Sequence, residues 1–166
     1  RKTNQEWKKI LNKESRGRFP ANSVLIPRAI RTTGRSYLSR NPVFVSTNFV
    51  VCSLPSLEMA IMMSTWMSTI FYQLICEVSS KDQEGMRKME VSDIEKTYVP
   101  KFDSISRETI DALSEECDAI EFLNLGRPQI REVDRIWARE LFGDNADGLL
   151  NKAQRMLEYL ANRRNP

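Results

Sequence analysis

The sequence contains no histidine among its 166 residues. Histidine is the commonest general base near neutral pH and a frequent metal ligand, and it activates the nucleophile in Ser-His and Cys-His arrangements. Its absence excludes all of those catalytic arrangements. Catalysis by carboxylates or lysine remains open, but a hydrolase is less expected than for a sequence that contains histidine.

The chain also lacks a long apolar run. Its richest apolar stretch, residues 57–78, is interrupted by polar residues that include Glu58, Gln73 and Glu77. A membrane-spanning helix needs about 20 consecutive apolar residues. We therefore expect no membrane span, and we interpret this stretch as a buried helix of a cytoplasmic protein.

Cysteine is scarce, and the usual catalytic motifs are missing. The three cysteines, Cys52, Cys76 and Cys117, are widely spaced, so we predict small core residues in a reducing compartment rather than a disulfide framework or a metal site. The sequence has no Gly-x-Gly-x-x-Gly fingerprint and no phosphate-binding Gly-Lys-Ser/Thr loop. We predict no catalytic residue, no cofactor-binding residue and no metal ligand in this chain.

Charge is distributed unevenly along the sequence. Residues 1–50 hold eleven lysines and arginines against two acidic residues, a net charge of +9, whereas residues 51–166 hold fourteen against twenty, a net charge of −6. A basic segment of this kind favours a polyanionic partner, because neutralising phosphates releases condensed counterions. A solvated basic face without a partner is the alternative that charge alone leaves open.

The pattern of apolar residues predicts an α+β fold. We expect a helix over residues 4–16, strands over 23–27, 36–40, 43–52 and 86–91, and one long buried helix from Ser56 to about Val78. The strands would form a small, mostly antiparallel twisted sheet packed on that central helix. About three further helices follow in the acidic remainder. The chain is accordingly divided into an α/β domain, residues 1–102, and a helical C-terminal subdomain, residues 103–166.

Several short motifs occur in an order that resembles a known family. They are LIPRAIR at 25–31, VSTNF at 45–49, WMST at 66–69, GMRKM at 85–89, VSDI at 91–94 and YVP at 98–100. This order is similar to the target recognition (specificity) domain of TaqI-type adenine-N6 DNA methyltransferases of type II restriction-modification systems, and to type I specificity subunits. The resemblance covers about residues 20–102. It implies a module that recognises duplex DNA sequence-specifically.

The same family also indicates what this chain lacks. An adenine-N6 methyltransferase holds the flipped base with an Asn/Asp-Pro-Pro-Tyr/Phe motif, and all seven prolines here are isolated. Catalysis is therefore expected in a methyltransferase domain elsewhere in the same parent chain, with or without a fused endonuclease. The resemblance implies S-adenosylmethionine as the cofactor of that parent and none for this fragment.

Side-chain chemistry suggests which residues would contact DNA. Arginine suits guanine, asparagine and glutamine suit adenine, lysine suits phosphate, and glycine lets the backbone approach closely. The candidates are Arg28, Arg31, Arg35, Arg40, Asn48, Gln83, Gly85, Arg87 and Lys88. We favour DNA contact by at least one of Arg87 and Lys88, which lie in the most family-like segment, over contact by Lys8 and Lys9, which fit a solvated helix face.

Two functions of other classes remain as alternatives. The acidic helices of the second half could dock on a partner protein, which would make the chain an interaction or scaffolding module. A metal-dependent nuclease fragment agrees less well with the sequence. Such a nuclease needs an aspartate followed by a Glu-x-Lys pair, and the pair at Glu6 and Lys8 has no aspartate before it. Salt-dependent DNA binding separates the first function from the second, and metal-dependent cleavage identifies the third.

Overall fold

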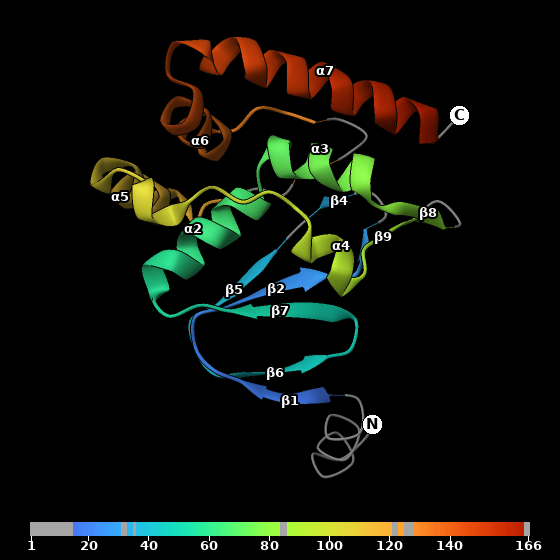
Figure 1. Cartoon of the computed structure of the whole chain (residues 1–166), viewed down its shortest axis with the longest axis vertical. Coiled ribbons are helices and arrows are strands. Elements are labelled where there is room, and N and C mark those ends of the chain that lie inside the picture. The colour runs from blue at the N-terminus through green and yellow to red at the C-terminus, as the bar shows by residue number, and fades with distance from the viewer. Residues whose placement is uncertain are drawn as a thin grey trace.

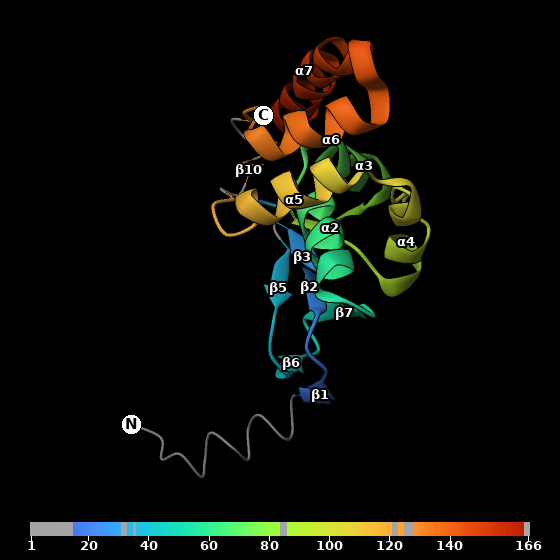
Figure 2. The same ribbon diagram turned by 90° about the vertical axis from the view of Figure 1, so that its left-hand side faces the viewer.

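The computed structural model describes residues 15–30, 33–34, 36–83, 86–120, 123–124 and 128–164. Of the helix expected over residues 4–16, residues 4–14 lie outside them, and the prediction is wrong for Ser15 and Arg16, which begin a strand. The strand pair β1 (Ser15–Phe19) and β6 (Val43–Ser46) lies at one end of the molecule, α6 (Glu132–Phe142) and α7 (Ala146–Arg164) lie at the other, and α2 (Leu57–Met67) and α3 (Ile70–Ser79) lie between (Figure 1). The view turned by 90° shows the same order (Figure 2). Antiparallel sheets combined with helices confirm the predicted α+β class.

The strands in the described residues form four small antiparallel sheets. Their bounds are β1 Ser15–Phe19, β2 Ser23–Pro27, β3 Ala29–Ile30, β4 Thr33–Gly34, β5 Tyr37–Ser39, β6 Val43–Ser46, β7 Phe49–Ser53, β8 Lys81–Gln83, β9 Met86–Lys88 and β10 Leu123–Asn124. The sheet orders are β5-β2-β7, β3-β9-β8, β1-β6 and β10-β4. Strand β2 is the central strand of its sheet and buries Val24 and Ile26 in the core.

Residues 43–52 were predicted as one strand, and that prediction is wrong. A turn at Thr47 and Asn48 separates β6 from β7, and the two strands pair with different partners, β1 and β2. The Asn48 backbone N–H donates to Ser46 Oγ at 3.3 Å. Serine, threonine and asparagine form such local bonds and favour turns, so they interrupt an otherwise strand-like apolar pattern. The strand expected over 86–91 likewise ends at Lys88, and a short helix, α4, Val91–Glu95, follows.

The long central helix is also interrupted. It consists of α2, Leu57–Met67, and α3, Ile70–Ser79, whose axes bend by 65° at the break. Ser56 caps α2, accepting from Met59 N at 3.2 Å. Thr69 caps α3 in the same manner, accepting from Tyr72 N at 3.2 Å. A hydroxyl side chain that caps a new helix start competes with continuation of the old helix, which explains the break.

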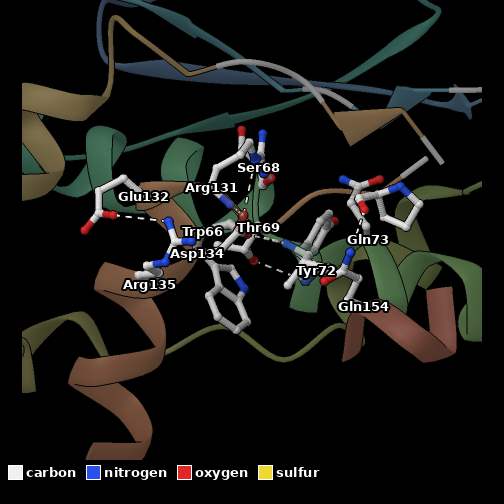
Figure 3. Close-up of polar contacts among 12 residues, drawn as sticks. Trp66, Ser68, Thr69, Tyr72, Gln73, Arg131, Glu132, Asp134, Arg135 and Gln154 are labelled. Carbon is white, nitrogen blue, oxygen red and sulfur yellow. Dashed lines mark hydrogen bonds and ion pairs between the residues drawn. The ribbon is translucent and has the colours of Figure 1, made fainter. Parts of the chain in front are cut away.

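A buried carboxylate from the C-terminal part of the chain holds this break (Figure 3). Asp134 is fully buried on α6, Glu132–Phe142, and accepts from the Ile70 backbone N–H at 2.7 Å. It also accepts from the Arg131 backbone N–H at 2.8 Å and from Arg131 Nε at 3.2 Å. Arg131 in turn donates through Nη2 to the Ser68 carbonyl. One carboxylate therefore satisfies the first N–H group of α3 and the N–H of Arg131, the residue that precedes α6.

The remaining helices cover α2 and α3. They are α5, Arg107–Glu116, and α7, Ala146–Arg164, with two short 3-10 helices, η1, Phe102–Ser104, and η2, Gly143–Asn145. Together with α6, α5 and α7 are the three helices expected in this part. Helix α7 packs on α3 and α6, and α5 packs on α2 and α6. No single helix in the described ranges is long and apolar enough to cross a membrane, although α2 and α3 taken together pass a test of length and composition.

The hydrophobic core crosses the predicted boundary at residue 102. One buried cluster includes Val24 and Trp66 from the first part together with Leu113 and Trp137 from the second. Trp137 lies edge-on to Trp66, with ring centroids 5.6 Å apart. The division into residues 1–102 and 103–166 stays a prediction. The packing joins the two segments into one core.

The three cysteines are free, and Cys76 and Cys117 belong to the hydrophobic core, in agreement with the role predicted for them. Cys76 is buried, and Cys52 and Cys117 are partly buried. Burial raises the pKa of the Cys76 thiol to about 12. This thiol is therefore neutral at physiological pH and chemically inert.

Candidate nucleic-acid interface

Three of the predicted DNA-contacting residues surround one hollow in the surface. Arg28, Asn48 and Lys88 line a hollow of about 690 Å³. They come from the β2–β3 junction, the β6–β7 turn and β9. The other residues that line it are Pro27, Ala29, Thr47, Phe49 and Glu90. Three chain segments far apart in sequence thus bring together side chains suited to bases and phosphates.

The main chain at Arg28 is fixed on both sides. Its N–H donates to the Asn48 carbonyl at 2.9 Å, and its carbonyl accepts from the Met89 N–H at 2.9 Å. The first bond ties it to the β6–β7 turn and the second to the segment after β9. The Arg28 side chain therefore projects from a rigid junction between the β5-β2-β7 and β3-β9-β8 sheets.

Glu90 is a member of this site that sequence reasoning missed. Its Oε2 accepts from Arg28 Nη2, and its Oε1 lies 3.6 Å from Lys88 Nζ. The side chains of Arg28 and Glu90 are 26% and 42% exposed, so both reach the surface of the hollow. The only sequence signal for Glu90 is its spacing to Asp93, which accepts from the Glu90 backbone N–H at 2.9 Å at the start of α4.

Arg40 lies at a different hollow. Its Nη2 donates to both carboxylate oxygens of Asp118, at 2.9 and 3.1 Å. This second hollow, about 650 Å³, is lined by residues that include Ser36, Ser64 and Cys117. Among the described residues, the two hollows share no lining residue.

Arg87 points into the protein. Its Nε donates to Glu77 of α3 at 3.0 Å, and the side chains of Arg87 and Glu77 are only 15% and 2% exposed. Neighbouring Lys88, on the opposite face of β9, is half-exposed. Of the two residues that the sequence favoured, Lys88 is the accessible one. The DNA-contact assignment of Arg87 stays a prediction.

Alanine substitutions should separate the roles of these neighbours. Arg87→Ala is expected to lower the free energy of unfolding by about 2 kcal/mol, because it removes a charge-assisted hydrogen bond to the buried Glu77 carboxylate. Lys88→Ala is expected to change it by less than about 0.5 kcal/mol, as for most surface residues. Urea denaturation followed by circular dichroism measures both. Equal destabilisation by the two variants would contradict the inward role of Arg87.

Three candidates, Arg31, Arg35 and Gly85, lie outside the described residues. Gln83 is described only through its backbone, which pairs with Met86 at the end of the β8–β9 ladder. Their assignments stay predictions.

Arginine, lysine, asparagine and glutamate side chains line the hollow beside Arg28 together with apolar residues, and its described lining contains no recognisable catalytic cluster. The described residues contain no group of three or more cysteine, aspartate or glutamate side chains that could hold a metal ion. The fold and site thus define an α+β binding domain that presents arginine, lysine and asparagine around one hollow.

Comparison with known proteins identifies the family. The family model described as restriction endonuclease BpuSI, specificity domain, matches residues 1–130, and the chain belongs to this family. Membership confirms the predicted class, a specificity module of a type II restriction-modification enzyme.

A solved structure gives the same result. The chain is similar to the type IIG restriction endonuclease BpuSI, with a TM-score of 0.85 and 36% sequence identity. The match covers 99% of this chain and 19% of that one, so the chain spans about a fifth of the length of its structural relative. No curated protein matches the chain.

Proposed function

We propose that this chain recognises a base sequence in duplex DNA and thereby positions the catalytic part of a restriction-modification enzyme. The observation that carries the proposal is membership of the specificity-domain family. The hollow beside Arg28 supports it, since cationic and amide side chains of three segments converge there. Side chains of these types contact base edges and phosphates in protein–DNA complexes.

We further propose that the catalytic part of the parent is an S-adenosylmethionine-dependent adenine methyltransferase that works in the cytoplasm. The ordered motifs of residues 25–100 resemble methyltransferase specificity regions, as described above. The structural relative is a type IIG restriction endonuclease more than five times as long as the match, which leaves room for such a part in a parent of similar build. S-adenosylmethionine would bind there.

DNA binding by the 166-residue chain tests the main proposal. Fluorescence anisotropy with a mixed-sequence duplex should show binding at low salt that weakens steeply as salt rises, because bound phosphates release their counterions. The double variant Arg28→Ala/Lys88→Ala should bind about tenfold more weakly or worse, and the salt slope should fall by about one for every phosphate that the variant no longer binds. The proposal fails if no duplex binds at any salt concentration.

A matched variant controls for net charge. Arg107→Ala/Lys152→Ala removes the same two charges from exposed positions on α5 and α7, away from the hollow, and should bind DNA nearly as the wild type does. Equal weakening in both double variants would assign binding to overall charge and not to this site. Cleavage of plasmid DNA by the chain with a divalent metal would instead support the nuclease alternative.

A further inference from the structure

The ion pair at the hollow offers hydrogen-bond groups of both kinds. Arg28 donates through Nη2 to Glu90 Oε2, and its Nε is buried without a hydrogen-bond partner in the described structure. A guanidinium carries N–H groups on all three nitrogens, so further donors remain on the two Nη atoms. Glu90 Oε1 lies 3.6 Å from Lys88 Nζ, beyond hydrogen-bond length, and keeps its capacity to accept.

This arrangement complements a G·C base pair. In the major groove guanine presents two acceptors, O6 and N7, and cytosine presents the amino group N4 as a donor. Arginine binds guanine through two parallel hydrogen bonds, and glutamate accepts from cytosine N4. We propose that Arg28 and Glu90 together read one G·C pair, with Arg28 donating to guanine and Glu90 accepting from cytosine. This inference rests on the proposed DNA-binding function.

The carboxylate distinguishes base reading from phosphate binding. A phosphate at Arg28 would lie within a few ångströms of the Glu90 carboxylate, and two negative charges at that separation repel each other. A base edge has no net charge, and its amino group gains from the same carboxylate.

The rigid main chain favours the same role. Discrimination between bases requires side chains held in a fixed position relative to the groove. Arg28 is held through its own N–H and carbonyl, and the Glu90 N–H is bonded to Asp93. Neither bond involves the side chain that would do the reading. Substitution of either side chain therefore leaves these main-chain bonds in place.

Selection from a pool of duplexes with a randomised centre tests the inference. Wild-type protein should enrich a motif that contains an invariant G·C pair, and changing that pair to A·T should weaken binding about tenfold or more. Arg28→Lys and Glu90→Ala should each reduce this discrimination to about twofold at the same position only, because lysine lacks the fork and alanine lacks the acceptor. Glu90→Gln, which keeps an accepting oxygen, should retain more discrimination than Glu90→Ala.

The outcomes separate this inference from the proposed function. Arg107→Ala serves as the control and should enrich the wild-type motif; circular dichroism melts confirm that every variant is folded. If the variants keep the wild-type motif, or weaken all duplexes equally, Arg28 and Glu90 do not read a base pair, although the domain still recognises DNA. DNA binding without any enriched motif overturns the inference as well. Absence of DNA binding by the wild type overturns the proposed function itself.

Discussion

Replacing Asp134 by alanine is expected to lower the free energy of unfolding by about 3–5 kcal/mol, the range measured when one partner of a buried ion pair is removed. Asp134 is fully buried and accepts hydrogen bonds from Ile70, at the start of α3, and from Arg131, at the start of α6. The substitution leaves the Arg131 guanidinium without its carboxylate and leaves the freed N–H groups buried away from water. Such unsatisfied buried groups carry their full desolvation cost.

Two further variants make this measurement specific. Asp134→Asn keeps an accepting oxygen but loses the charge, so its effect should lie between those of wild type and alanine. Asp144→Ala removes an exposed carboxylate from η2 and should change the stability by less than about 0.5 kcal/mol. Urea denaturation monitored by circular dichroism gives all three values. A loss below about 1 kcal/mol in Asp134→Ala would mean that other contacts hold the break between α2 and α3.

Replacing Trp137 by alanine is expected to cost about 3–5 kcal/mol, because removal of a large buried ring loses its transfer free energy and leaves a cavity. Trp137 is fully buried, lies edge-on to Trp66 and donates through Nε1 to Thr65 Oγ1 at 3.2 Å. Tyr159→Ala, which removes an exposed aromatic ring from α7, is the matched control and should cost much less. Trp137→Phe should fall between them.

The Trp137 variant also tests whether the chain folds as one unit. Trp66 precedes residue 102 and Trp137 follows it, and both belong to one buried cluster. We therefore expect a single unfolding transition that shifts as a whole in Trp137→Ala. Far-ultraviolet circular dichroism and tryptophan fluorescence should report the same midpoint. A second transition that the substitution leaves unmoved would favour separate domains at residues 1–102 and 103–166.

Local patterns in the sequence predicted the strands and helices but not their interruptions. Strand β2 was predicted with its correct bounds, since its apolar residues are continuous and proline ends it. The breaks at Asn48 and Thr69 were missed because apolar residues resume directly after each short polar stretch, so each segment was predicted as one continuous element. A capping hydroxyl and a buried carboxylate 64 residues away stabilise the second break, and no local pattern reveals so distant a partner.

Only some residues of the candidate site could be predicted, because local sequence does not reveal contacts between distant segments. Residue chemistry selected Arg28, Asn48 and Lys88, and the fold brings them to one hollow. It also selected Arg87, whose alternation with Lys88 along β9 turns its side chain towards Glu77. Glu90 was not predicted as a site residue because its partner, Arg28, lies 62 residues away in the sequence. Its importance follows from a pairing of strands that the sequence alone does not specify.

The main-chain anchoring of Arg28 has a consequence for how this fold can diversify. The junction is held by the N–H and carbonyl groups of residues 28, 48 and 89, which every amino acid except proline supplies in full. Side chains at 28 and 48 can therefore be exchanged while the bonds that fix the junction remain. Under the proposed function, substitutions at these two positions would change the recognised sequence while the backbone of the junction stays the same.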